Sequence, residues 1–122
     1  MLIPNMLLKK LYTAGSLKNT EAGTEFVLNN RLSDAELVGV RRIAIDGAPV
    51  PLEAVQLEVA SRGVLAPAQV DNAHPIQFPL SSTLKIRTGA RQLSQGKHQI
   101  EVSFDTRPFG NLQVSVEDMV IS

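Results

Sequence analysis

Cysteine and tryptophan are absent from the 122 residues of this chain, and aromatic residues make up only 4% of it. Without cysteine there are no disulfides and no thiolate ligands for a metal ion, and the composition fits a reducing compartment. We therefore expect a cytoplasmic protein whose core is held by aliphatic packing.

An excess of charge of either sign is also missing, since twelve basic and twelve acidic side chains cancel to a formal charge of zero. A protein that neutralises many phosphates needs a strong basic field, so nucleic acid is excluded as an expected partner. A near-neutral chain with 43% hydrophobic residues has little charge repulsion to keep copies apart. Covering of apolar surface by another chain, including self-association, is therefore an expectation.

Long hydrophobic runs are missing as well. The apolar opening over residues 1–8 stops at Lys9 and Lys10, whereas a secretory signal would place its basic residues before a longer apolar stretch. No segment approaches the roughly 20 apolar residues that a membrane-spanning helix needs. We expect a soluble protein without a targeting segment or a membrane partner.

What the sequence does contain is an alternation of apolar and polar residues, broken by turn formers every eight to twelve positions or so. The clearest example is residues 97–105, where His98, Ile100, Val102 and Phe104 share one face of a strand. Gly96 permits the turn before it, as in the corner of many immunoglobulin-like domains. This pattern predicts an all-β, antiparallel immunoglobulin-like sandwich of about seven or eight strands, forming a single domain over residues 1–122.

Several elements are less regular. The Asp46-Gly47 pair predicts a tight turn between strands at 38–45 and 55–59. A shift of apolar parity in the first strand predicts a β-bulge near Arg41 and Arg42. The opening 7–12 fits a helix or a strand, and the β character of the rest favours a strand. The stretch 63–80 is expected to be mostly loop, with at most one short edge strand at residues 64–65.

Two histidines are the side chains whose ordinary pKa suits proton transfer near neutral pH. His98 lies on the apolar face of its strand, which favours a packed histidine bonded to the backbone at the strand's end. His74 lies close to Asp71 on a polar loop, where binding residues often occur, although a solvated loop histidine is the simpler interpretation. The two histidines do not supply the three or four ligands of a zinc site.

Two further groups suggest contact with a partner or ligand. Arg41 and Arg42 indicate either an anion site or two solvated side chains at a bulge. Arg107 and Phe109 lie on a short turn and are residue types enriched at interfaces, with the alternative that Phe109 caps the core. No phosphate-binding loop, nucleophile elbow or paired-carboxylate motif is present. The sequence therefore predicts no catalytic, cofactor-binding or metal-binding residue in this chain, with Asp71, His74, Arg107 and Phe109 at the edge of a site or interface.

One family resemblance adds to this. Residues 25–28, 37–51 and 55–57, with the later stretch 93–102, resemble the small beta subunit of bacterial C-glycoside deglycosidases. That resemblance implies a non-catalytic β-sandwich that stabilises a larger TIM-barrel alpha subunit. The alpha subunit would bind a divalent metal and cleave 3-oxo-C-glycosides, so this chain would be part of a carbon–carbon lyase.

The alternative is a stand-alone sandwich that binds a sugar or protein, or a homo-oligomeric structural protein. Small proteins of this general type also carry a hydroxymethylglutaryl-CoA reductase label. A reductase needs a nicotinamide site and catalytic residues, which the sequence lacks, so we discount that label.

Overall fold

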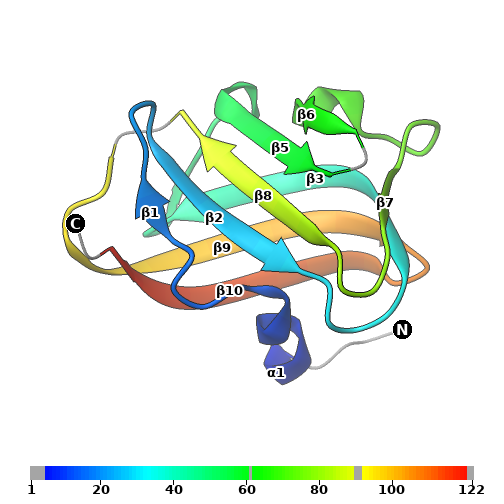
Figure 1. Cartoon of the computed structure of the whole chain (residues 1–122), viewed down its shortest axis with the longest axis horizontal. Helices are drawn as coiled ribbons and strands as arrows, with labels where there is room; N and C mark the ends of the chain where they lie inside the picture. The colour runs from blue at the N-terminus through cyan, green and yellow to red at the C-terminus, as the bar shows by residue number, and fades with distance from the viewer. Residues whose placement is uncertain (1–4, 61, 90–91, 121–122) are drawn as a thin grey trace.

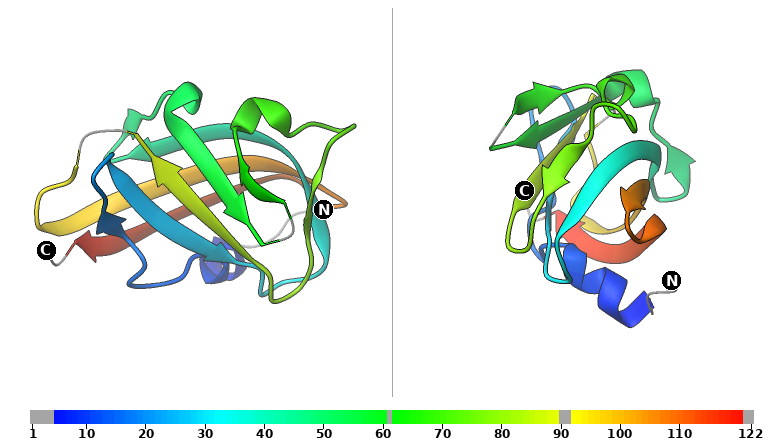
Figure 2. Two further views of the ribbon diagram at one scale, coloured as in Figure 1. Left: turned by 45° about the horizontal axis from the view of Figure 1, so that its top comes forward. Right: turned by 90° about the vertical axis from the view of Figure 1, so that its right-hand side faces the viewer.

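The computed structural model describes residues 5–60, 62–89 and 92–120, and its strands form two antiparallel sheets that lie face to face (Figures 1 and 2). The expected all-β sandwich is confirmed. It has ten strands rather than seven or eight because four of them span only two or three residues. The first sheet has the order β1-β2-β8-β5-β6, with bounds Lys18–Asn19, Thr24–Asn29, Thr83–Thr88, Val55–Val59 and Gly63–Leu65.

The second sheet contains the longest strands. Its order is β10-β9-β3-β4, and β7 pairs with one end of β3; the bounds are Gly110–Val120, Gly96–Arg107, Ala35–Ile45, Ala48–Pro49 and Ile76–Phe78. The alternation predicted for 97–105 is confirmed in β9, where every second residue from His98 to Thr106 is buried. The core between the sheets draws on both of them, with fully buried Phe26, Leu57, Ile86, Ile43 and Ile100.

The strand expected over residues 7–12 was wrong. This segment forms a short α-helix, α1 (Asn5–Leu8), followed by a 3₁₀ helix, η1 (Lys9–Leu11), and only Tyr12 makes a β-bridge, to Leu28. Leu8 and Leu11 are both buried. Residues three apart share one face of a helix but point to opposite faces of a strand, so the helical form buries both leucines.

The hairpin expected between 38–45 and 55–59 was also wrong, although its turn is present. Asp46 and Gly47 have φ angles of 54° and 82°, which is the left-handed pair of a tight hairpin turn. The chain then returns only as β4, because Pro49 and Pro51 lack the N–H groups that a longer ladder requires. After the 3₁₀ helix η2 (Leu52–Ala54), β5 joins the other sheet and pairs with β8.

The short edge strand expected at residues 64–65 is confirmed as β6. The rest of the stretch 63–80 is more structured than predicted, since it contains the 3₁₀ helix η3 (Pro67–Gln69) and β7. The β-bulge expected near Arg41 and Arg42 is confirmed by a register shift between Val40 and Arg42, and a second shift lies between Leu37 and Gly39. Among the described residues, no helix has the length and apolar character that a membrane span requires.

Candidate functional site

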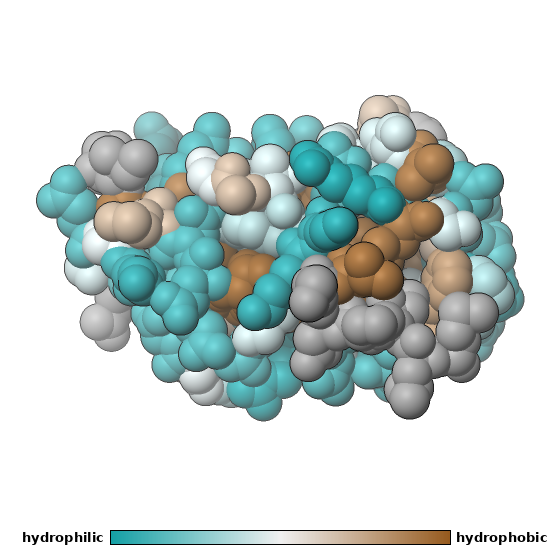
Figure 3. All heavy atoms as spheres, turned by 90° about the horizontal axis from the view of Figure 1, so that it is seen from below, coloured by the Kyte–Doolittle hydropathy of each residue, from teal (hydrophilic) through white to brown (hydrophobic). Residues whose placement is uncertain are grey.

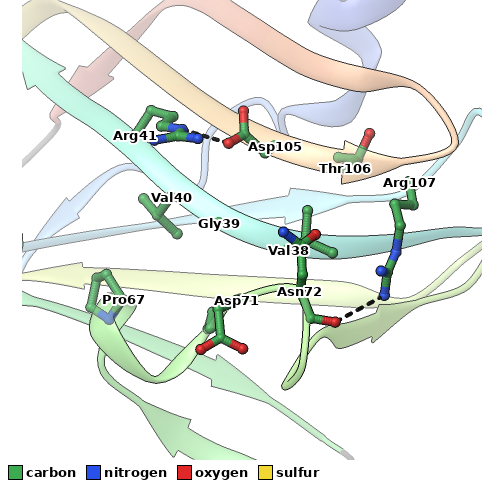
Figure 4. Close-up of a pocket in the computed structure, with 11 residues that line it drawn as sticks. Val38, Gly39, Val40, Arg41, Pro67, Asp71, Asn72, Asp105, Thr106 and Arg107 are labelled. Carbon is green, nitrogen blue, oxygen red and sulfur yellow. Dashed lines mark hydrogen bonds and ion pairs between the residues drawn. The ribbon is translucent and has the colours of Figure 1, made fainter.

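A cleft of about 460 Å³ opens between β3 and the loop that follows η3 (Figure 4). Val38 and Val40 from β3 face Pro67 and Val70 and supply its apolar part. Figure 4 shows Arg41 and Asp105 at one end of the cleft and Arg107 with Asn72 at the other. Its volume lies within the range of ligand pockets, which is about 300–1,000 Å³.

Arg41 is held at the cleft by the bulge of β3. The extra residue brings Arg41 within reach of the neighbouring strand β9, where its Nε donates to Asp105 Oδ2 at 2.5 Å. Asp105 also accepts a hydrogen bond from Asn111 Nδ2 at 3.0 Å. The bond from Asn111, with a further contribution from Arg41, lowers the pKa of Asp105 against the opposing effect of burial. Asp105 therefore stays ionised and fixes the Arg41 side chain.

Arg107 closes the other end of the cleft. Its Nε donates to Glu36 Oε1 at 3.1 Å, and its Nη2 reaches the Asn72 carbonyl oxygen at 3.4 Å. Glu36 also accepts a hydrogen bond from Gln77 at 2.7 Å. The Arg107 side chain thus connects the end of β9 to the loop across the cleft, as the dashed line in Figure 4 shows.

Asp71 and His74, which the sequence places on one loop, interact directly. Asp71 Oδ1 accepts hydrogen bonds from the backbone N–H groups of Ala73 and His74 at 2.9 and 2.7 Å, and lies 3.0 Å from His74 Nδ1. The contact with the His74 ring is the main cause of a lowered pKa of Asp71. Figure 4 shows the Asp71 carboxylate turned away from β3. The pair therefore shapes the loop beside the cleft, and Asp71 is one of the residues that line it.

Phe109 lies apart from these residues. It is half-buried and packs against the core, beside a small apolar groove that is also lined by Leu32 and Leu112. Apolar atoms gather on the face of the molecule that carries α1 (Figure 3), where Leu7 is 38% exposed. Of the four predicted edge residues, the structure brings Asp71, His74 and Arg107 to the region of the cleft and leaves Phe109 outside it.

The expectation that His98 is a packed, backbone-bonded histidine is confirmed. Its Nε2 lies 2.7 Å from the Ser94 carbonyl oxygen, and its Nδ1 lies 2.6 Å from Asp46 Oδ2. The bond to Asp46, followed by the bond to Ser94, raises the pKa of His98. The Asp46 partner was missed, because it lies 52 residues away in a turn predicted only for its backbone shape.

A second polar contact, between Tyr12 and Asp118, was not predicted from the sequence. The Tyr12 hydroxyl donates to Asp118 Oδ2 at 2.5 Å, and the backbone N–H groups of Gly15 and Leu17 donate to the same oxygen at 3.0 and 3.3 Å. Burial and the neighbouring carboxylate raise the pKa of Tyr12 above its ordinary range. This contact joins the N-terminal segment to β10 near its end.

We tested whether the residues of the chain fit a metal ion or a nicotinamide cofactor. Across residues 5–60, 62–89 and 92–120, no three His, Cys, Asp or Glu side chains come together as a metal centre would require. A dinucleotide site of the common kind uses a strand, a glycine-rich turn and the N-terminus of a helix. The one α-helix in the described residues has four residues and does not follow such a turn. The described residues therefore do not form a dinucleotide site of this kind.

Comparison with known proteins corrects the family expected from the sequence. The family model described as hydroxymethylglutaryl-CoA reductase, N-terminal domain, matches residues 7–121, and no curated protein matches the chain. The resemblance to a C-glycoside deglycosidase beta subunit was therefore wrong, and with it the function as a subunit of that lyase. The phrases that carried the resemblance are strand and turn patterns that many β-sandwiches share. The discounting of the reductase label was wrong as well: the chain belongs to the hydroxymethylglutaryl-CoA reductase N-terminal domain family.

Proposed function

We propose that this chain is a non-catalytic domain that assembles with the catalytic part of a hydroxymethylglutaryl-CoA reductase. The observation that supports the proposal is the match of residues 7–121 to the family described as hydroxymethylglutaryl-CoA reductase, N-terminal domain. The chain would then act by stabilising or positioning its partner.

The contacts that the ionisable side chains make within the chain support a structural role for this domain. Three carboxylates with a lowered pKa, Asp46, Asp71 and Asp118, each engage a histidine or tyrosine of the same chain. Two of these contacts join segments far apart in the sequence, and the third shapes a loop. Contacts of this kind hold segments of the chain to one another.

The cleft end of the sandwich is the surface we assign to the partner. Asp71, His74 and Arg107 lie there on loops and strand ends, with Arg107 46% exposed and His74 68% exposed at their side chains. Charged groups at an interface steer the encounter of two partners and fix their register. We place the protein in the cytoplasm, in keeping with its lack of cysteine. We also treat the chain as one folding unit.

The test is reconstitution. The full chain and the hydroxymethylglutaryl-CoA reductase catalytic polypeptide of the same genome are purified separately, mixed, and analysed by size-exclusion chromatography with light scattering. We expect a mixed complex, and nicotinamide-dependent reductase activity only when the catalytic polypeptide is present. Turnover by this chain alone, or a homo-oligomer that never binds the catalytic polypeptide, would overturn the proposal.

A further inference from the structure

The middle of β3 lacks a neighbouring strand on the side that faces the cleft. β7 pairs with residues 35–37 of β3 and β4 pairs with residues 44–45, while β9 runs along the opposite edge. Residues 38–42 lie in the gap between these two short strands. The cleft opens directly onto this stretch, since Val38, Gly39, Val40 and Arg41 line it.

The backbone in this gap is free to pair. Among the described residues, no backbone hydrogen bond joins 38–42 to any segment other than β9, and no side chain bonds to it from the cleft. An unpaired strand edge presents N–H and C=O groups that an extended peptide can bind by adding a strand. At about 3.3 Å per residue, the gap has room for roughly four residues of such a peptide.

The side chains around the gap favour an acidic occupant. Arg41 uses only its Nε, for Asp105, and its side chain is 70% exposed. Arg42 is exposed and makes no ion pair or hydrogen bond within the part of the chain that the structure describes. The neighbouring carboxylates are already engaged. Asp105 is bound by Arg41 and Asn111, and Glu36 by Arg107 and Gln77. Asp71, which also lines the cleft, accepts from two backbone N–H groups of its own loop and contacts the His74 ring. Donors are therefore in surplus at this edge.

We propose that the edge of β3 at residues 38–42 is a docking slot for an extended acidic segment of a partner protein, which adds to the sheet as a short strand. Alternate side chains of that strand would point to opposite faces. On one face an apolar side chain would contact Val40 and Pro67, and on the other a carboxylate would meet the terminal nitrogens of Arg41. This inference does not depend on which protein supplies the segment.

The experiment uses amide NMR spectra of the full chain, titrated with a capped peptide of alternating valine and glutamate. We expect shift changes concentrated at residues 38–42 and at the cleft residues Asn72 and Arg107. Two matched peptides are controls. One replaces glutamate by lysine and should bind at least tenfold more weakly, because its lysines would meet Arg41 and Arg107, which line the cleft. The other carries N-methyl groups on alternate residues and should lose binding, because it cannot complete the strand hydrogen bonds.

Two variants test the side chains. Arg41→Gln should weaken binding of the acidic peptide by roughly threefold to tenfold, as expected for loss of one partly exposed charge contact. Lys97→Gln, at the far end of β9, removes a comparable exposed charge and should leave binding unchanged. Unchanged spectra would mean that the bulges and arginines simply protect the edge from pairing, and would overturn the proposal. So would equal binding of the lysine peptide, or the same shifts produced by isovalerate alone, which would indicate a small-molecule site.

Discussion

The Asp46 carboxylate lies 2.6 Å from Nδ1 of His98, while the Ser94 carbonyl oxygen lies 2.7 Å from Nε2 of the same ring. A carbonyl oxygen only accepts hydrogen bonds, and so does an ionised carboxylate. Both ring nitrogens can donate only when His98 is an imidazolium, so these two contacts favour the protonated ring. This charged pair joins the turn after β3 to the beginning of β9, and Asp46 Oδ1 adds a bond from the Gln99 N–H at 2.9 Å.

The first prediction concerns stability against pH. The folded state raises the pKa of His98 above its ordinary value of 6.5, so the folded protein holds this proton more tightly than the unfolded chain. The resulting stabilisation is complete below pH 6.5 and is lost as pH rises through the raised pKa. We expect the free energy of unfolding in urea to fall as pH rises above 6.5. In His98→Gln this part of the slope should disappear, and an unchanged slope would contradict the assignment.

The second prediction concerns the same pair at lower pH. The pKa of Asp46 is lowered from 3.8, mainly by its bond to His98, so its stabilisation is present above pH 3.8 and is lost as pH falls through the lowered pKa. Asp46→Asn should remove this contribution and reduce the His98 pKa, which can be measured from the imidazole proton shifts in an NMR titration. Asp71→Asn is the control, because Asp71 lies on another loop and should leave the His98 pKa unchanged.

The third prediction uses the fact that Tyr12 is the only tyrosine and that tryptophan is absent. Ultraviolet absorbance therefore follows the ionisation of this one phenol. Because burial and Asp118 raise its pKa, phenolate absorbance should appear only well above pH 10 in the folded protein, and near pH 10 in denaturant. A folded-state titration near pH 10 would show that the contact with Asp118 is not formed.

The fourth prediction concerns the N-terminal segment. Leu11 is 3% exposed and packs against the core, whereas Lys10 is exposed. Leu11→Ala should lower the free energy of unfolding by about 2–4 kcal/mol, as expected for truncation of a buried leucine. Lys10→Ala should change it by less than about 0.5 kcal/mol. Equal effects of the two substitutions would argue against the helical arrangement of this segment.

The local features of this fold can be predicted from the sequence much better than the pairing of strands that are distant in the sequence. The alternation in β9, the Asp46-Gly47 turn and the bulge near Arg41 all follow from neighbouring residues, and each is confirmed. The pairing of β5 with β8 does not, because alternation tells which face of a strand is buried and not which strand lies beside it. The error at residues 7–12 has the same origin, since a few leucines satisfy either periodicity.

The candidate site was harder to predict from the sequence, for a related reason. Asp71 and His74 are three residues apart, so their contact follows from the loop sequence. Arg107 reaches Asn72 across 35 residues, and Asp105 meets Arg41 across 64, so only the folded sheets bring these groups to one cleft. The family could not be identified from short strand and turn motifs, because such motifs are common to many β-sandwiches and do not distinguish one family from another.

The contact between Tyr12 and Asp118 has a mechanical consequence. It connects positions 106 residues apart, near opposite ends of the chain, and Gly15 and Leu17 bind the same carboxylate oxygen. A pulling force applied between residues 12 and 118 would load these three bonds directly, before it reached the ladder between β9 and β10. Rupture should therefore begin with the N-terminal segment leaving β10, and Asp118→Ala should lower the first rupture force while the force that opens the remaining sandwich stays the same.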